Sequence, residues 1–176
     1  MKNIRNWQLV LLAAMLPFIG NAQDEKAAVM DALSEMIGGK WVIQTKWENG
    51  GEFHQEQIFE WGLNETIIKV TTFGTVNQKT GEFGLRNEGI RAWDGQEKVM
   101  KFWEFDVFGG ITTGTCGVDS NAFYYEYEYA PDGNPQTFRD VWTKIDLDTY
   151  KYQVGTFADG AFSKVFLEVT AKRSRD

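Results

Sequence analysis

The stretch Met36–Trp47 reads MIGGKWVIQTKW and marks the change from a helical pattern to a strand pattern. Gly38 and Gly39 predict the end of a helix, because glycine adopts at low cost the left-handed backbone conformation found there. Directly after them, Trp41 and Ile43 fall on one face of an extended chain, and Val42, Gln44 and Lys46 fall on the other. The stretch therefore predicts a short helix followed at once by a first strand.

Upstream of the two glycines, Asp24–Ile37 is the segment with a helical period. Its apolar side chains recur at the spacing of one helix face, and they are Val29, Met30, Leu33, Met36 and Ile37. A helix of this length gains most of its stability from packing. We therefore expect this face to pack on the remaining chain and to close one mouth of whatever the strands build.

Downstream, the chain repeats one unit, a strand and then a turn rich in Gly, Asn and Asp. Ten strands are predicted, at Lys40–Glu48, Glu52–Trp61, Thr66–Val76, Glu82–Trp93, Val99–Asp106, Ile111–Val118, Ala122–Ala130, Gln136–Ile145, Thr149–Thr156 and Phe162–Ala171. Short turns make neighbouring strands antiparallel, and closure removes the exposed edges of such a meander. The predicted fold is an all-β, antiparallel up-and-down barrel. A two-sheet sandwich is less favoured, because its Greek-key connections are usually longer.

The first residues have the pattern of an export signal. Lys2 and Arg5 precede an apolar run at Leu9–Ile19, and Gly20-Asn21-Ala22 supplies the small residues of a cleavage site. The run is shorter than the roughly 20 residues of a membrane-spanning helix. We therefore predict a signal peptide at 1–22, a barrel domain at 23–176, a periplasmic or secreted location, and no integral membrane anchor.

Charge and cysteine content exclude several classes of function. Loss of Lys2 and Arg5 with the signal would take the net charge from −7 to −9, and an acidic domain repels phosphate backbones. Nucleic acid is therefore not expected as a partner. Cys116 is the single cysteine and His54 the single histidine, so neither an internal disulfide nor a site with several histidine ligands is predicted.

Gly39-Lys40-Trp41, placed after a helix and before a ten-strand meander, resembles the opening of the calycin superfamily, the lipocalins and their relatives. The stretch from Trp93 to Phe105 is similar to uncharacterised lipocalin-like proteins exported by bacteria. The resemblance implies that Trp41 closes one end of the barrel and packs on a basic side chain, here Lys172 or Arg173. It also implies an internal pocket for a small, mostly apolar ligand. The haem-binding relatives have a histidine near the C-terminus, which this chain lacks.

Interior positions alternate along each barrel strand, so candidate site residues depend on the turn lengths. If Trp41 points inward, a two-residue first turn would place His54 and Glu56 inside, with Ile58 and Glu60. A three-residue turn would instead place a more apolar set inside, namely Phe53, Gln55, Gln57, Phe59 and Trp61. The apolar content favours the second arrangement. His54 with Glu56 remains a candidate ligand-binding pair, and His54 a candidate haem ligand.

Aromatic and charged residues of the later strands are the other candidates. Trp103, Tyr125 and Trp142 are expected to line the wall, since aromatic side chains combine apolar area with polar tips that can orient a ligand. Of the neighbours Arg139 and Asp140 at most one can point inward. An inward Arg139 would need a carboxylate or an anionic ligand, and Glu56, Glu104 and Glu126 are the possible internal partners.

The function predicted from these patterns is binding of a small hydrophobic or amphipathic ligand inside an exported barrel, with Arg139 holding its polar head. No cofactor is predicted. Catalysis has little support, since Ser, Cys and His form no recognisable nucleophile motif. The alternatives are an enzyme using Glu, Tyr and Arg in the same cavity, a haem-binding barrel through His54, and an interaction barrel with a filled core. An enzyme would show a buried carboxylate with a raised pKa beside a tyrosine or an arginine.

Overall fold

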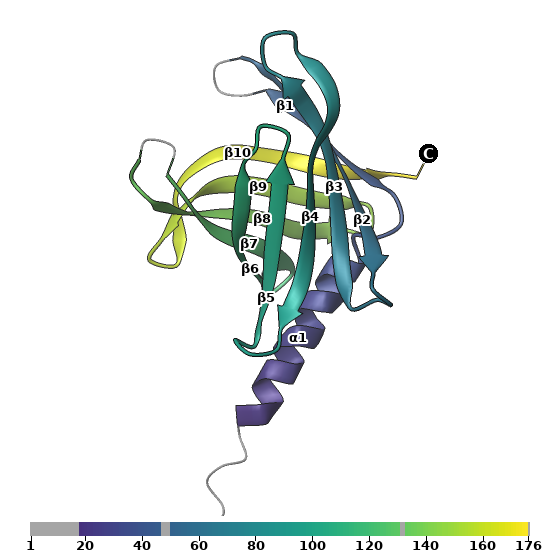
Figure 1. Cartoon of the computed structure of the whole chain (residues 1–176), viewed down its shortest axis with the longest axis vertical. Coiled ribbons are helices and arrows are strands. Elements are labelled where there is room, and N and C mark those ends of the chain that lie inside the picture. Colours follow the sequence, from purple (N-terminus) through teal and green to yellow (C-terminus); the bar gives the residue numbers. More distant parts are fainter. Residues whose placement is uncertain (1–17, 47–49, 131–132, 176) are drawn as a thin grey trace, which may run out of the picture.

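The computed structural model describes residues 18–46, 50–130 and 133–175. These form one helix, α1 (Phe18–Ser34), and ten strands, β1 (Lys40–Lys46), β2 (Glu52–Gly62), β3 (Ile67–Asn77), β4 (Glu82–Asp94), β5 (Val99–Asp106), β6 (Ile111–Asp119), β7 (Ala122–Tyr129), β8 (Gln136–Asp146), β9 (Thr149–Ala158) and β10 (Ala161–Ser174). Each strand pairs antiparallel with its neighbour in sequence, and β10 pairs with β1 to close a barrel (Figure 1). The predicted up-and-down barrel is confirmed.

The helix differs more from its predicted bounds than the strands do. It begins at Phe18, inside the predicted signal peptide, and ends at Ser34 rather than at Ile37. The chain tightens at this end, because the amides of Met36 and Ile37 donate to the carbonyls three residues earlier, at 3.1 Å each. None of the described helices is both long and apolar enough to cross a membrane.

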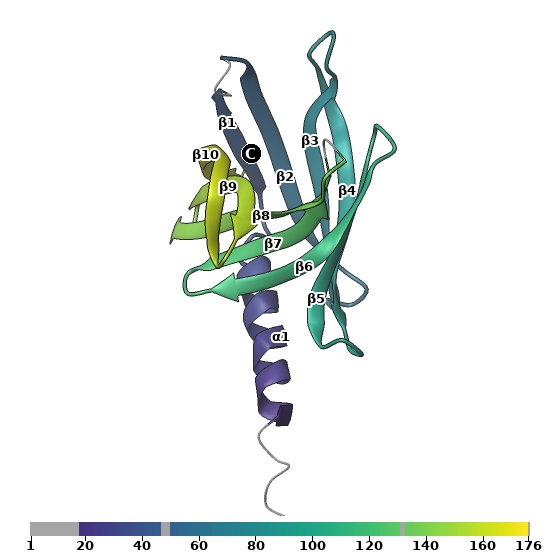
Figure 2. The same ribbon diagram turned by 90° about the vertical axis from the view of Figure 1, so that its left-hand side faces the viewer.

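The apolar face of α1 packs against one end of the barrel. Val29, Leu33 and Met36 are buried in the same cluster as Trp41, as the sequence predicted. Both views show the C-terminal half of α1 under the strands and its N-terminal half projecting away from them (Figures 1 and 2). The Trp41 indole donates its Nε1 hydrogen bond to the carbonyl of Met36 at 2.8 Å. Helix and first strand are thereby joined at the barrel's closed end.

Arg173 covers the outer side of this junction. Its guanidinium lies 4.5 Å from the centre of the Trp41 ring and donates to the carbonyls of Ile37 and Leu147 at 3.0 Å each, and to that of Glu35. Gly39 leaves room for this contact. A Cβ there would lie 2.7 Å from the Ser174 carbonyl oxygen and 2.9 Å from the Arg173 side chain.

Gly39→Ala is therefore expected to lower the free energy of unfolding by roughly 1–3 kcal/mol, because a positive φ of 143° and the close contacts act together. Gly38→Ala is the matched control, since Gly38 also has a positive φ, 91°, but no atom within 4 Å of the added Cβ. Urea denaturation should show the larger loss for Gly39→Ala. Equal losses would mean that the contact with Arg173 is easily relieved.

Aromatic side chains fill the half of the barrel that adjoins α1. Trp41 and Trp142 meet edge to face at 6.2 Å, and Trp142 stacks on Phe123 at 5.9 Å. Tyr150 packs on Trp41 at 5.1 Å. These rings are at most 2% exposed. The interior on this side is solid, so any ligand-sized space must lie toward the β5–β6 hairpin.

Candidate ligand-binding site

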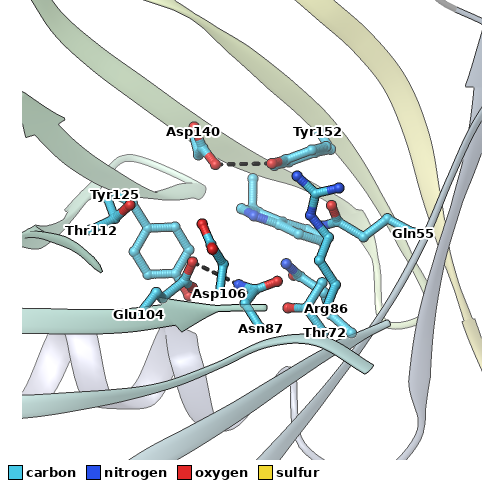
Figure 3. A pocket seen from close by; sticks show the side chains of 12 residues that line it. Gln55, Thr72, Arg86, Asn87, Glu104, Asp106, Thr112, Tyr125, Asp140 and Tyr152 are labelled. Atoms are coloured by element: carbon cyan, nitrogen blue, oxygen red, sulfur yellow. Dashed lines mark hydrogen bonds between the residues drawn. The ribbon is translucent and has the colours of Figure 1, made fainter. Parts of the chain in front are cut away.

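A cavity of about 210 Å³ lies above this aromatic cluster. Trp142, Tyr125 and Tyr152 belong to its wall, and the other lining side chains shown in Figure 3 are polar. Arg86 and Asp106 supply opposite charges near the β5–β6 hairpin. The volume is below the range of roughly 300–1,000 Å³ that is typical for drug-sized ligands, so the site suits a smaller molecule or one end of a larger one.

Asp140 is held from both sides by tyrosines of the neighbouring strands. Tyr127 on β7 donates to Asp140 Oδ1 at 3.0 Å, and Tyr152 on β9 donates to Oδ2 at 2.9 Å (Figure 3 draws the second bond). Burial raises the pKa of Asp140 to about 6, although both hydrogen bonds act in the opposite direction. The carboxyl group therefore changes its charge close to neutral pH. Burial also raises the pKa of both tyrosines, which remain proton donors.

Beneath the cavity, Arg91 forms a buried charged contact. Its side chain is 1% exposed and pairs with Glu104 on β5. Its Nε donates to the Tyr125 hydroxyl at 3.3 Å, and the guanidinium lies 4.6 Å from the centre of that ring. Asn87 donates to the other Glu104 oxygen at 2.9 Å. A Cβ at Gly89 would lie 2.6 Å from Arg91 Nη1, so glycine there gives the guanidinium its space.

Four buried polar side-chain atoms have no hydrogen-bond partner among the described residues; one is Arg173 Nε, beside α1, and the other three lie at or near the cavity. These three are Gln57 Oε1, Thr72 Oγ1 and Arg91 Nη1, on the consecutive strands β2, β3 and β4. Gln57 and Thr72 are register partners, and both line the cavity. Buried polar groups are nearly always hydrogen-bonded to protein, water or a ligand. The polar group of a ligand could therefore form hydrogen bonds with Gln57 and Thr72 at this part of the cavity wall.

Beside the cavity, the pairing of β6 with β7 opens toward the surface. These strands pair only from Gly114 and Tyr127 inward, so Ile111 and Tyr129 have no partner across the gap in this register. A hollow of about 680 Å³ lies at this gap and shares Thr112 with the inner cavity. Phe108, which also lines it, is 53% exposed, and Ile111 is 67% exposed. The outer hollow is thus more apolar than the inner cavity.

Two of the wall residues that the sequence suggested lie inside the barrel. Tyr125 and Trp142 are buried and line the cavity. Trp103 does not, because Phe102 and Glu104 on either side of it point inward; it lies on the outer face opposite Ile90. The expectation for Trp103 is therefore corrected.

Arg139 is also placed outside, contrary to expectation. Its Nε is 2.6 Å from Glu126 Oε2, and its guanidinium lies between the rings of Tyr124 and Phe157, at 3.9 and 3.8 Å from their centres. Asp140, its neighbour, points inward instead. Arg139 therefore cannot hold a ligand head in the cavity; Arg86 lines the cavity, and Arg91 is buried beneath it.

The first turn gives β2 the parity that excludes His54 and Glu56 from the cavity. Trp41 pairs with Gln57, so odd-numbered residues of β2 point inward. On the outer face, Glu56 pairs with Lys40 at 2.9 Å and lies 3.4 Å from His54 Nε2. The His54 ring stacks on Phe83 at 4.6 Å. A haem inside the barrel could not be ligated by His54 in this arrangement.

Arg91 and the inward position of Asp140 were not predicted from the sequence. For Asp140, the alternation of inward and outward residues along β8 could have predicted it. Trp142 and Asp140 are two residues apart and share a face, whereas Trp142 and Arg139 are three apart and cannot both point inward in a regular strand. Arg91 carried no such signal. A buried arginine is rare without a partner, and its partner, Glu104, is brought to it only by pairing of β4 with β5.

No protein-family model matches the chain, and no curated protein matches it. Two solved structures show a similar outline. A redesigned beta barrel, b11L5F_LGL, has 17% identity and a TM-score of 0.42, over 81% of this chain and 95% of that one. EF1p2_mFAP2b bound to DFHBI has 13% identity and a TM-score of 0.42, over 83% and 99%. The fold and the site define the chain as a closed ten-stranded barrel with a polar interior cavity, and its lipocalin-like resemblance stays a prediction.

Proposed function

We propose that this barrel binds a small amphipathic molecule outside the cytoplasm, as an exported lipocalin-like protein. The polar end of the molecule would occupy the inner cavity, and its apolar part would lie in the outer hollow between β6 and β7. The observation that carries the proposal is the pair of buried, unpartnered atoms Gln57 Oε1 and Thr72 Oγ1 on the cavity wall. A purely hydrophobic ligand would leave both without a partner, which is costly.

The experiment is a titration of the purified protein with four compounds that share one aromatic ring and differ in head group: benzyl alcohol, benzamide, benzoate and benzylamine. Amide and indole NMR signals of the cavity residues report binding. At least one compound is expected to shift the signals of Tyr125 and Trp142, which line the cavity. If none of the four shifts these signals at millimolar concentration, the proposal is wrong.

Thr72→Val removes one unpartnered hydroxyl without changing the shape of the side chain. The variant is expected to weaken binding about two- to tenfold, the value of one hydrogen bond, while its stability stays equal or rises. Thr71→Val is the matched control, because Thr71 is the preceding residue on β3 and points to the opposite face. Equal weakening by both variants would place the ligand elsewhere.

A second candidate function is acid–base catalysis, and the pKa of Asp140 near 6 beside Tyr127 and Tyr152 favours it. A carboxyl group with a pKa close to ambient pH is suited to general acid or base chemistry. The test is hydrogen–deuterium exchange at the α-carbon of a small ketone, acetophenone, followed by NMR in D₂O. Acceleration that disappears in Asp140→Asn would support this function, and exchange at the rate of buffer alone would oppose it.

A further inference from the structure

The charges that face the cavity leave one negative charge uncompensated. Arg91 is paired with Glu104 in an ion pair, and Arg86 is matched in number by Asp106 near the hairpin. Asp140 remains, with hydrogen bonds from two neutral tyrosines and no ion pair among the described residues. A carboxylate in an enclosed site is costly unless a cation accompanies it.

The wall opposite supplies hydrogen-bond acceptors that also lack a partner. Gln57 is 8% exposed and Thr72 is 1% exposed, and both line the same cavity as Asp140. The Gln57 carbonyl oxygen accepts hydrogen bonds, and the Thr72 hydroxyl can accept one. A cation that bears N–H groups could donate hydrogen bonds to all three kinds of acceptor here, the carboxylate, the amide oxygen and the hydroxyl oxygen.

We propose that the polar end of the ligand is a protonated nitrogen group, an ammonium or amidinium, carried on a small apolar or aromatic body. This inference rests on the proposed function and names its ligand class. The nitrogen would pair with Asp140 and donate to Gln57 and Thr72. Tyr125, Tyr152 and Trp142 also line the cavity, and aromatic rings attract cations through their electron-rich faces.

An anionic head group is disfavoured by the same geometry. Glu104 and Asp140 both line the cavity, whereas Arg91 lies beneath it and is already paired. A metal ion lacks a suitable ligand set, since no group of three or more His, Cys, Asp or Glu side chains is arranged to hold one within the described residues. The remaining cation at the cavity, Arg86, donates to the Thr75 carbonyl at 3.0 Å and lies 5.5 Å from the ring centre of Phe108.

The test compares the four ring compounds on the wild type and on two variants. Benzylamine is expected to bind at least tenfold more tightly than benzyl alcohol or benzamide at about pH 7.5, and benzoate most weakly. Asp140→Asn should remove this preference. Glu88→Gln is the control, because it removes one negative charge from an exposed position on the outer face of β4 and should leave the preference unchanged.

The pH dependence gives a second readout that needs no variant. The groups around the Asp140 carboxyl are Tyr127 and Tyr152, with Glu104 and Arg91 further off, and Arg86 and Asp106 line the same cavity. The pKa of Asp140 is about 6, so the affinity for benzylamine should fall about tenfold between about pH 7.5 and about pH 5 as the carboxylate is protonated. The affinity for benzyl alcohol should change little.

The outcomes separate the inference from the proposed function. If benzyl alcohol, benzamide or benzoate binds the cavity as tightly as benzylamine, the cation preference is wrong while the proposed function stands. If benzylamine binds with the same affinity to wild type and Asp140→Asn, the assignment of Asp140 is overturned. If none of the four binds, the inference and the proposed function both fall.

Discussion

Glu104→Gln is expected to lower the free energy of unfolding by roughly 3–5 kcal/mol. Arg91 is 1% exposed and has its ion pair with Glu104, so the substitution leaves a buried positive charge without a counter-ion. Its Nη1 already lacks a partner, and the Tyr125 hydroxyl accepts from Nε only at 3.3 Å. Urea denaturation at neutral pH measures the loss.

The outer face of the barrel supplies the control. Glu126→Gln breaks the Arg139–Glu126 pair on the neighbouring strands β7 and β8. Arg139 keeps its contacts with two aromatic rings there and is 19% exposed, so the loss should stay within about 1 kcal/mol. The double variant Arg91→Met with Glu104→Leu should recover most of the stability lost in Glu104→Gln. Equal losses for the two single variants would show that water reaches Arg91 freely.

Asp140→Asn is expected to abolish a pH dependence of stability between about pH 4 and pH 6. The pKa of Asp140 is raised from 3.8 to about 6 on folding, so in this interval the folded state binds more protons than the unfolded state. Stability without ligand therefore falls as pH rises through this window. The full effect is at most roughly 3 kcal/mol, and less where water in the cavity screens the charge.

The measurement is the difference in free energy of unfolding between wild type and Asp140→Asn as a function of pH. The difference isolates Asp140, because all other titrating groups are common to both proteins. The free energy of unfolding of the variant should rise relative to that of the wild type as the pH increases to about 7. Above that pH the difference should stay constant. A difference that does not vary with pH would mean that Asp140 is as well solvated in the folded chain as in the unfolded one.

The barrel could be predicted from the sequence because its signals are local. Turn residues at Asn49-Gly50-Gly51 and Asp94-Gly95, and the alternation between them, define antiparallel neighbours without knowledge of any distant contact. The strand bounds agree to within three residues, the largest difference being at the end of β10, at Ser174. The helix was harder to delimit, since the apolar residues before Asp24 continue its period.

The interior of the site could not be predicted with the same success, because it depends on parity and on charge pairing across strands. One residue more or less in a turn exchanges the two faces of the next strand, and for this reason His54 and Glu56 lie outside. Arg91 and Glu104 are 13 positions apart in sequence, and neither predicts the other until β4 and β5 are paired.

The helix-packed end of the barrel has a consequence for how a ligand is exchanged. Trp41, Leu33 and Met36 are fully buried there, so the barrel is filled at this end and the cavity does not run through it. A ligand therefore enters and leaves at the end of the barrel away from α1, where the cavity and the β6–β7 hollow share Asp106 and Thr112. Binding of one ligand molecule and release of another therefore cannot take place at the same time, because both use the same end of the barrel. A competitor, a membrane or a receiving protein would change the residence time of the ligand by acting at that end, which includes the β5–β6 hairpin with Asp106.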